Sequence, residues 1–299
     1  MPASKHAARS SANASLEKPK MKKLGFIGGG NMAEALAHGL IQHKVFKPAD
    51  IIVSDVAPER RRKLARSLKV ATTDDNTEVI RESAAVLIAV KPQTIDAVMS
   101  EIAAELAKAS KKTAGKGKLF ISIAAGVTIE RLTRGLGKRA RVIRVMPNAP
   151  AMVGHGMAAM VRARGASPAD ELFALRIFNA VGDAVALKDE KLLDVVTALS
   201  GSGPAYVYLF AKALADAAVS EGIPRELAIR MTLKTIRGAE HLMRESKREV
   251  ADLIRAVASP GGTTEAALRR FAEHGFSDIV ANALHAASDR SRELGRGIN

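Results

Sequence analysis

A glycine-rich turn near the start of the chain has the residue types and spacing that bind a dinucleotide phosphate. Within Leu24–Ala33, the residues Gly28, Gly30 and Ala33 match the pattern G-x-G-x-x-G/A. The first glycine makes a tight turn, the second lets the backbone approach a pyrophosphate, and the third small residue lets a helix pack against a strand. The helix start then presents unpaired N–H groups to the phosphates. We therefore predict a dinucleotide site, rather than a glycine turn with a purely structural role.

An acidic residue and three arginines bear on which dinucleotide is bound. Ile51–Ser54 is followed by Asp55, where an acid hydrogen-bonds an adenosine ribose. A carboxylate favours the free hydroxyls of NAD because it repels a 2′-phosphate, whereas Ser54 could hydrogen-bond either form. The segment Arg60–Arg62 lies just downstream and could reach a 2′-phosphate, or could form only a solvated helix start. The sequence leaves the choice between NADPH and NADH open.

A second helix start, Ser259–Thr264, has the composition of a carboxylate site. Its sequence Ser-Pro-Gly-Gly-Thr-Thr precedes an amphipathic stretch. Successive N–H groups, with no bulky side chain at Gly261 or Gly262, can bind a small carboxylate, and the serine and threonine hydroxyls can add hydrogen bonds. The alternative is a glycine-rich helix cap.

The first glycine turn must be held by a sheet, and the sequence predicts one. Short apolar runs alternate with amphipathic stretches, and several runs are continuous, which suits strands that are covered on both faces. Strand–helix alternation predicts a doubly wound parallel sheet with helices on both faces, over residues 21–188. The runs are Leu24–Ile27, Ile51–Ser54, Val86–Val90, Leu119–Ala124, Arg141–Met146, Met157–Val161 and Ala184–Leu187.

Residues 189–299 have only helical patterns, and we predict an all-α domain. Apolar residues fall on one face of each segment, and Gly and Pro separate the segments. The helices are rich in alanine and poor in aromatics, so each helix buries little apolar area within the chain. We therefore expect burial against a second subunit. The segments are 205–220, 225–244, 249–258 and 264–274.

Composition narrows the classes of protein further. The 299 residues include no cysteine, which excludes disulfides, thiolate catalysis and cysteine-bound metals, and the seven histidines show no metal-ligand spacing. The net charge of +15 suggests nucleic-acid binding, but only 3% of residues are aromatic, so base-stacking platforms are scarce. Part of this charge lies in residues 1–20, which we expect to be a disordered basic tail without a secretory signal. We expect no nucleic-acid or membrane partner, no metal and a cytoplasmic location.

Six sequence blocks, in this order, resemble the pyrroline-5-carboxylate reductase family. The resemblance runs from about Lys22 to about Leu294. The first block is shared by many dehydrogenases, whereas the last two, at their separation, are specific to this family. The blocks are Gly25–Met32, Ala89–Pro92, Ser122–Val127, Met146–Asn148, Ser200–Tyr206 and Ser259–Thr264.

The resemblance implies a reaction and an assembly. The reaction is reduction of the cyclic imino acid 1-pyrroline-5-carboxylate to L-proline, the last step of proline biosynthesis, with hydride from NADPH or NADH. The implied fold is an N-terminal Rossmann domain followed by an all-α dimerisation domain. Such enzymes form homodimers, often assembled into larger rings such as decamers, and their substrate site lies near the dimer interface.

The resemblance also assigns roles to individual residues. Thr264 is expected to be catalytic, contacting the ring nitrogen and helping to deliver a proton, and Lys91 is expected to contact the cofactor rather than to act in catalysis. The expected substrate-binding residues are Ser259, Gly261, Gly262, Thr263 and Thr264. The expected cofactor-binding residues are Ile27, Gly28, Gly30, Asn31, Met32, Ser54, Asp55, Asn76, Ala89, Val90, Lys91, Pro92, Ala124, Ala125 and Gly126.

The sequence departs from the family in places, and other functions stay open. Asp55-Val56 stands where many relatives carry Asn-Arg, and Glu249-Val250 where many carry His-Pro, which puts the usual NADPH preference and one side of the substrate pocket in doubt. A β-hydroxyacid dehydrogenase would need a lysine at the position of Val207, which counts against that function. A non-enzymatic NAD(P)-binding regulator and a nucleic-acid binder remain as alternatives.

Overall fold

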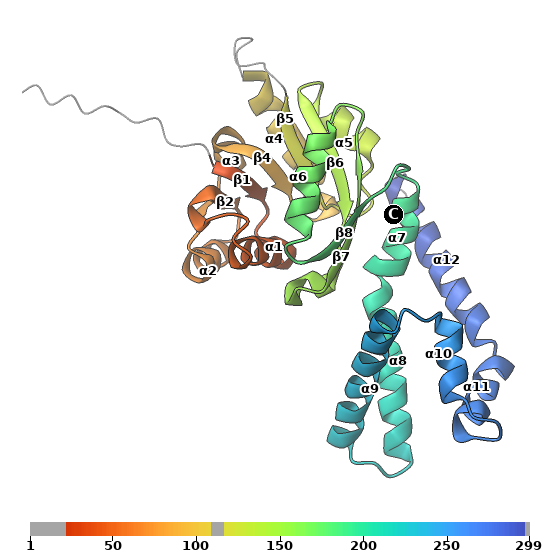
Figure 1. Ribbon diagram of the computed structural model, residues 1–299. Coiled ribbons are helices and arrows are strands. Elements are labelled where there is room, and N and C mark those ends of the chain that lie inside the picture. Colours follow the sequence, from red (N-terminus) through yellow and green to blue (C-terminus); the bar gives the residue numbers. More distant parts are fainter. Residues whose placement is uncertain (1–21, 109–116, 297–299) are drawn as a thin grey trace, which may run out of the picture.

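The computed structural model describes residues 22–108 and 117–296 (Figure 1). An α/β region with a central sheet comes first and an all-helical region follows, so the predicted fold class is confirmed. The sheet ends at Ala186 and the next helix begins at Leu192. The domain limits at residue 188 stay a prediction, and the expected tail at 1–20 lies outside the residues that the structure describes.

The strands and helices have the following bounds. The strands are β1 (Lys22–Ile27), β2 (Ile51–Ser54), β3 (Ala71–Thr73), β4 (Ser83–Ile88), β5 (Lys118–Ser122), β6 (Ala140–Met146), β7 (Gly156–Arg162) and β8 (Gly182–Ala186). The first helices are α1 (Asn31–Gln42), α2 (Pro58–Leu68), α3 (Asn76–Glu82), α4 (Ile95–Lys108), α5 (Ile129–Leu136) and α6 (Pro168–Phe178). The helical region contains α7 (Leu192–Val196), α8 (Gly203–Ser220), α9 (Arg225–Glu245), α10 (Val250–Val257), α11 (Thr263–Glu273) and α12 (Phe276–Gly295).

The sheet is doubly wound. Its strand order is β3-β2-β1-β4-β5-β6-β7-β8, and the strands from β3 to β6 pair in parallel. The winding direction reverses between β1 and β4, and a ligand crevice forms at the carboxyl ends of strands where such a reversal occurs. The glycine turn follows β1 directly, so the fold places it in this crevice.

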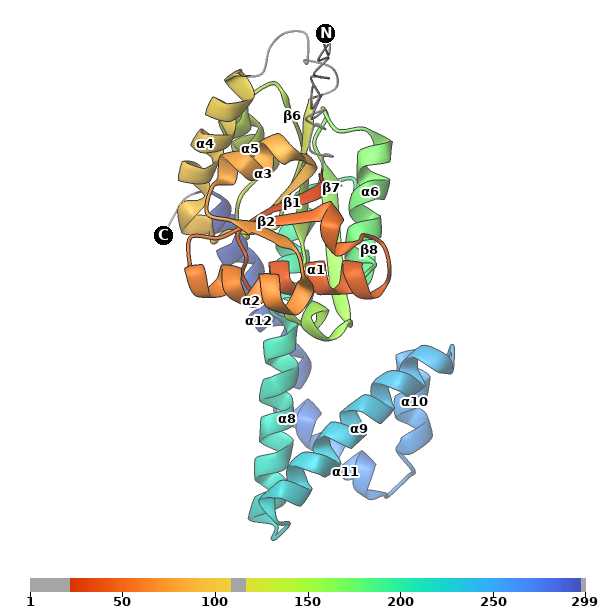
Figure 2. The same ribbon diagram turned by 90° about the vertical axis from the view of Figure 1, so that its left-hand side faces the viewer.

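Helices cover both faces of the sheet, with α3, α4 and α5 on one side and α1 and α6 on the other (Figure 2). Successive strand residues alternate between two buried clusters. Phe26 and Leu87 pack in the cluster that includes residues of α1, α2 and α6, whereas Ile27 and Ile88 pack in the cluster with α3, α4 and α5. Burial on both faces explains the continuous apolar runs in the sequence.

Two features of the sheet differ from the predicted all-parallel arrangement. Strand β3 was not predicted because Ala-Thr-Thr is only three residues long and its side chains are half-buried. Strand β7 runs antiparallel to β6, because the chain between them is one short 3₁₀ turn, Ala149–Val153, ending at left-handed Gly154. A parallel crossover needs about a dozen residues or more.

Helix α6 begins with a capping box that is partly buried. The Ser167 hydroxyl and N–H both donate to Asp170 Oδ2 at 2.8 Å, and Arg141 pairs with the other carboxylate oxygen. Burial acts to raise the pKa of the Asp170 carboxyl, but the hydrogen bonds from Ser167 and the Arg141 guanidinium outweigh it and hold the pKa below its ordinary value. The carboxylate form is therefore the one that stabilises the fold.

Replacing Asp170 by asparagine is expected to lower the free energy of unfolding by about 1 kcal/mol at neutral pH. Because the folded-state pKa is depressed, this contribution is present above about pH 4 and is lost as the pH falls through the folded-state value. Urea unfolding at pH 7 and near pH 3 checks the sign, with the exposed Asp183→Asn as the matched control. An equal difference between wild type and Asp170→Asn at both pH values would contradict this account.

The helical region leaves apolar faces uncovered. Helices α8 and α9 pack as a hairpin, and Phe210 of α8 meets Phe276 at the start of α12 with ring centroids 6.4 Å apart (Figure 1). Leu233 is 58% exposed and Phe271 is 41% exposed, although both lie on predicted buried faces. Exposed large apolar residues gathered in one region are typical of surfaces that meet another protein. The other exposed large apolar residues in this region include Tyr208, Leu209, Phe210, Leu227, Ile229, Met231, Leu242, Met243, Ile254, Val257, Ile279 and Val280.

Contacts near both ends of the helical region join it to the first region, and Leu193 of α7 also packs against β7. Glu190 Oε1 accepts hydrogen bonds from Arg144 Nη1 of β6 and from the N–H of Ile129, both at 2.7 Å. The end of α12 returns to the loop after β5, where a Cβ at Gly126 would lie 3.1 Å from Leu294 Cβ. The helical region is therefore fixed at its beginning and at its end.

No helix among residues 22–108 and 117–296 has the length and apolar character that crossing a membrane requires.

Candidate functional site

The glycine turn is held tightly against the ends of three strands. Gly28 has φ +96°, and its N–H donates to Ser54 O at 2.9 Å. A Cβ at this position would lie 2.7 Å from Ala89 O and 3.1 Å from Val90 Cγ1. Only glycine satisfies both the left-handed backbone and the close approach. The structure thus brings the predicted residues Gly28, Ala89 and Val90 together.

The start of α1 is open to a ligand. Its N-cap, Gly30, makes no side-chain capping bond, and the first helical hydrogen bond runs from Glu34 N to Gly30 O at 2.9 Å. The N–H groups of Asn31, Met32 and Ala33 precede that bond and are the unpaired donors of the helix. A Cβ at Gly30 would meet nothing within 4 Å. Free amides, a positive helix end and open space at the second glycine fit a pyrophosphate.

Asp55 is fixed by the glycine turn. Its Oδ2 accepts from Gly29 N and its Oδ1 accepts from Ala57 N, both at 2.8 Å. The Gly29 carbonyl in turn accepts from Arg60 Nε at 2.9 Å and Nη2 at 2.7 Å, and the same guanidinium pairs with Glu34. Both main-chain groups of Gly29 are therefore held by side chains from the segment after β2. This anchoring role of Arg60 was not predicted, because nothing in the sequence pairs it with Gly29.

Ser54, the last residue of β2, lies beside Asn76, the first residue of α3. The Ser54 hydroxyl is fully buried and donates to Asn76 Oδ1 at 2.7 Å, and Asn76 Nδ2 donates to Glu101 Oε2 at 2.7 Å. Asn76 is the first residue of α3, whose N-cap is Asp75. Hydrogen bonds from Thr77, chiefly from its hydroxyl, hold the pKa of the Asp75 carboxyl below its ordinary value. No local pattern indicates the role of Glu101, since only the fold brings α4 to Asn76.

The remaining predicted cofactor residues line the ends of β4 and β5. Lys91 and Pro92 are exposed where a 3₁₀ turn begins, and Ala124 is buried beside exposed Ala125. Ala89 N donates to Ile27 O at 2.8 Å, which ties the end of β4 to that of β1. These residues follow neighbouring parallel strands, so they share the carboxyl edge with the glycine turn.

The predicted carboxylate loop, Ser259–Thr264, connects α10 to α11 and is differently arranged from expectation. Gly262 N donates to Ser259 O at 2.9 Å, and Gly261 N donates to Glu265 Oε2 at 2.7 Å. The first helical bond of α11 runs from Ala266 N to Gly262 O at 3.1 Å. The unpaired amides are therefore those of the first turn, at residues 263–265, and not those of the two glycines.

One chain does not bring the two helix starts together. In both ribbon views the segment containing α10 and α11 lies well away from the sheet that carries the glycine turn (Figures 1 and 2). The connections between α8 and α12 are at most five residues long and offer no reach across that separation within the same chain. Thr264 and Gly28 thus belong to separate parts of the folded chain.

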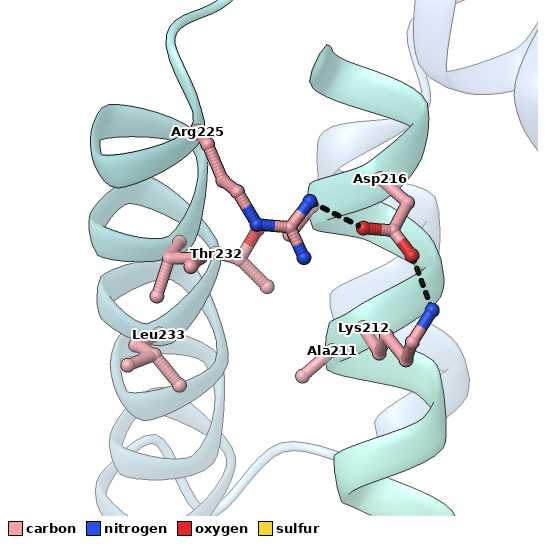
Figure 3. Close-up of a pocket in the computed structure, with 8 residues that line it drawn as sticks. Ala211, Lys212, Asp216, Arg225, Thr232 and Leu233 are labelled. Atoms are coloured by element: carbon pink, nitrogen blue, oxygen red, sulfur yellow. Dashed lines mark hydrogen bonds and ion pairs between the residues drawn. The ribbon is translucent and has the colours of Figure 1, made fainter. Parts of the chain in front are cut away.

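A small apolar pocket of about 210 Å³ lies between α8 and α9 (Figure 3). An ion-pair cluster closes one side, where Asp216 contacts Lys212 and, at 3.2 Å, Arg225. The hydrogen bond from Lys212 is the main cause that holds the pKa of Asp216 below its ordinary value. Because it lies on the helical hairpin, this pocket is separate from the dinucleotide crevice. Its other lining residues are Ala211, Ala215, Ile229, Thr232 and Leu233.

No group of three or more His, Cys, Asp or Glu side chains that could hold a metal ion occurs in the part of the chain that the structure describes.

Two protein-family models match the chain. The model for pyrroline-5-carboxylate reductase dimerisation matches residues 190–294. The model for NADP oxidoreductase, coenzyme F420-dependent, matches residues 23–126. The matches divide the chain in the same order as its two structural regions.

Curated relatives match over nearly the whole length. A pyrroline-5-carboxylate reductase of Synechocystis sp. is 40% identical over 274 residues, which cover 92% of this chain and 98% of that protein. The enzyme of the same name from Escherichia coli is 36% identical, covering 92% of this chain and 99% of that protein.

Solved structures agree with these matches. A pyrroline-5-carboxylate reductase from Coxiella burnetii superposes with a TM-score of 0.84 at 34% identity, covering 92% of this chain and 98% of that one. The pyrroline carboxylate reductase of Plasmodium falciparum, solved with NADP bound, gives a TM-score of 0.80 at 32% identity, covering 93% and 100%.

Proposed function

The chain belongs to the pyrroline-5-carboxylate reductase family, and on this premise we propose which of its residues bind and orient the reactants. The reaction is reduction of 1-pyrroline-5-carboxylate to L-proline, the final step of proline biosynthesis, with NADPH or NADH. The observation that carries the residue assignment is the uncapped start of α1, where free amides face open space beside Gly30.

The α1 start binds the pyrophosphate of the cofactor, and the ends of β4 and β5 hold its nicotinamide half. When bound, the cofactor supplies a hydride to the carbon of the C=N bond. The chain contributes orientation and electrostatic stabilisation rather than a covalent intermediate. The cofactor-binding set is the one inferred from the sequence, from Ile27 to Gly126.

The α11 start binds the substrate carboxylate through the amides of its first turn, with Ser259 and Thr263 adding hydroxyl groups. The positive end of the helix favours the anion. The Thr264 hydroxyl lies on the same turn, forms a hydrogen bond with the ring nitrogen and helps to deliver its proton. A threonine hydroxyl is a weak acid, so a ring nitrogen that arrives protonated needs only to be oriented.

A second copy of the chain completes the site in this proposal. Support comes from the separation of Thr264 from the glycine turn within one chain and from the uncovered apolar faces of α8–α12. The match to a dimerisation domain over 190–294 points to an oligomer. A decameric ring and a cytoplasmic location stay predictions.

The test of the reaction is oxidation of NADH and of NADPH by the purified full-length chain when 1-pyrroline-5-carboxylate is added. We expect L-proline to appear in equal amount to the cofactor oxidised. Absence of turnover with both cofactors would contradict the assignment.

Replacing Thr264 by alanine is expected to lower kcat/KM for the imino acid roughly tenfold, because a hydrogen bond to a charged ring nitrogen is lost. The Kd for the cofactor should stay nearly unchanged, since Thr264 lies apart from the α1 start. The conservative Thr264→Ser retains the hydroxyl and should restore most of the activity. Equal losses in kcat/KM and cofactor affinity would indicate a structural role only.

A further inference from the structure

We propose that Asp55 makes the dinucleotide site selective for NADH over NADPH. The proposal rests on the cofactor-binding role assigned above to the α1 start and the end of β2. It concerns the position where an acidic residue after the second strand of a doubly wound sheet meets the adenosine ribose. The sequence left this choice open, because Asp55 and the arginines that follow it favour opposite answers.

The Asp55 carboxylate cannot turn away from the ribose position. Each of its oxygens accepts a main-chain N–H at 2.8 Å, one from Gly29 in the glycine turn and one from Ala57. Moving the carboxylate would break both bonds and release the turn itself. The remaining lone pairs can accept from ribose hydroxyls, whereas a 2′-phosphate would meet a fixed negative charge.

Arg60 and Arg61, near the start of α2, are already bound to main-chain oxygens and carboxylates. Arg60 donates from Nε and Nη2 to Gly29 O and pairs with Glu34 at 3.1 Å. Arg61 donates to Asp55 O at 2.7 Å and pairs with Asp74 at 3.2 Å. A 2′-phosphate would have to take a guanidinium from a carboxylate in either case, so neither arginine offsets the charge of Asp55 without a loss elsewhere.

Two further groups that could favour NADPH are directed elsewhere. The Ser54 hydroxyl is fully buried and donates to Asn76 Oδ1 at 2.7 Å. Arg62 lies on an exposed depression of α2 with Glu59, Lys63 and Arg66. Two side chains hold Gly29, and because the Arg60 guanidinium is paired with Glu34, the Asp55 carboxylate is the group left to meet the ribose.

The experiment measures the Kd of NADH and of NADPH, without substrate, by titration calorimetry on the full chain at one ionic strength. The wild type is expected to bind NADH at least about tenfold more tightly than NADPH, because placing a 2′-phosphate beside the Asp55 carboxylate brings two negative charges together. Asp55→Asn should reduce this ratio at least about tenfold, because the side chain then carries no charge against a 2′-phosphate, while the loss of one main-chain hydrogen bond to the turn affects both nucleotides. Glu59→Gln removes the same charge from an exposed position on α2 and should leave the ratio unchanged.

The outcomes separate this proposal from the function on which it rests. Tighter binding of NADPH by the wild type, or an unchanged ratio in Asp55→Asn, overturns the selectivity while leaving the reductase assignment in place. An equal change in Glu59→Gln also overturns it, because the effect would then come from net charge. Binding of neither nucleotide would overturn the proposed cofactor site together with the selectivity.

Discussion

Gly30→Ala is expected to weaken NADH binding by between about tenfold and a hundredfold without destabilising the folded chain. The backbone at Gly30 has φ −67° and ψ −179°, which alanine adopts readily, and its Cβ would meet nothing within 4 Å. That open space is where the second glycine of the fingerprint lets a pyrophosphate approach. A methyl group forced against the ligand costs about 1–3 kcal/mol, which is about tenfold to a hundredfold in Kd.

The stability of Gly30→Ala is the informative half of this experiment. Alanine restricts the unfolded chain but is a poorer N-cap than glycine, and because these two effects oppose each other, thermal unfolding should occur at nearly the same temperature. Gly165→Ala is the matched control, because its Cβ would meet only Ala140 O, at 3.9 Å, in a turn away from the crevice. Undiminished NADH affinity in Gly30→Ala would place the pyrophosphate elsewhere, and a large loss of stability would show that the space beside Gly30 is not open.

Glu190→Ala is expected to lower the free energy of unfolding by about 3 kcal/mol or more. The Arg144 side chain is only 6% exposed, and Glu190 is the carboxylate that compensates its charge. Removing one member of a buried pair leaves the other charge without compensation, which is more costly than losing the attraction itself. The Ile129 N–H at the start of α5 would lose its acceptor as well.

Urea unfolding at one fixed protein concentration measures this effect, since oligomer stability depends on concentration. Glu130→Ala is the control, because it removes an exposed carboxylate that pairs with Arg134 on α5 and should cost at most about 1 kcal/mol. Combining Glu190→Ala with Arg144→Met should recover part of the loss, since no buried charge then remains. A loss in Glu190→Ala as small as that in Glu130→Ala would mean that Arg144 is adequately solvated.

The sequence predicted the elements whose signal is local. The apolar runs indicated seven strands because burial on both faces selects continuous apolar residues, and the fingerprint indicated the turn because Gly28 needs a left-handed backbone. Strand β3 was not predicted because Ala71–Thr73 is too short and too polar to give a pattern. The antiparallel direction of β7 was not predicted because strand direction follows from the length of a connection, not from composition.

Side-chain partners that are distant in sequence could not be predicted. Nothing in the residues after β2 indicates that Arg60 binds the carbonyl of Gly29, because that contact exists only once α2 has packed beside α1. In the same way, Glu265 takes the Gly261 amide that the sequence assigned to a ligand. Residue type indicates what a group can bind, and the fold decides whether the group is free to do so.

The attachment of the helical region at several points restricts how it can move. A segment joined by a single linker swings in all directions, whereas this region is held near Glu190, near Ser200 and again near Leu294. The contact at Leu294 lies beside Gly126, next to the strand ends assigned to the nicotinamide. Any movement of the helical region is therefore smallest beside the dinucleotide site and largest at the tip of the α8–α9 hairpin, which lies furthest from these contacts (Figure 1).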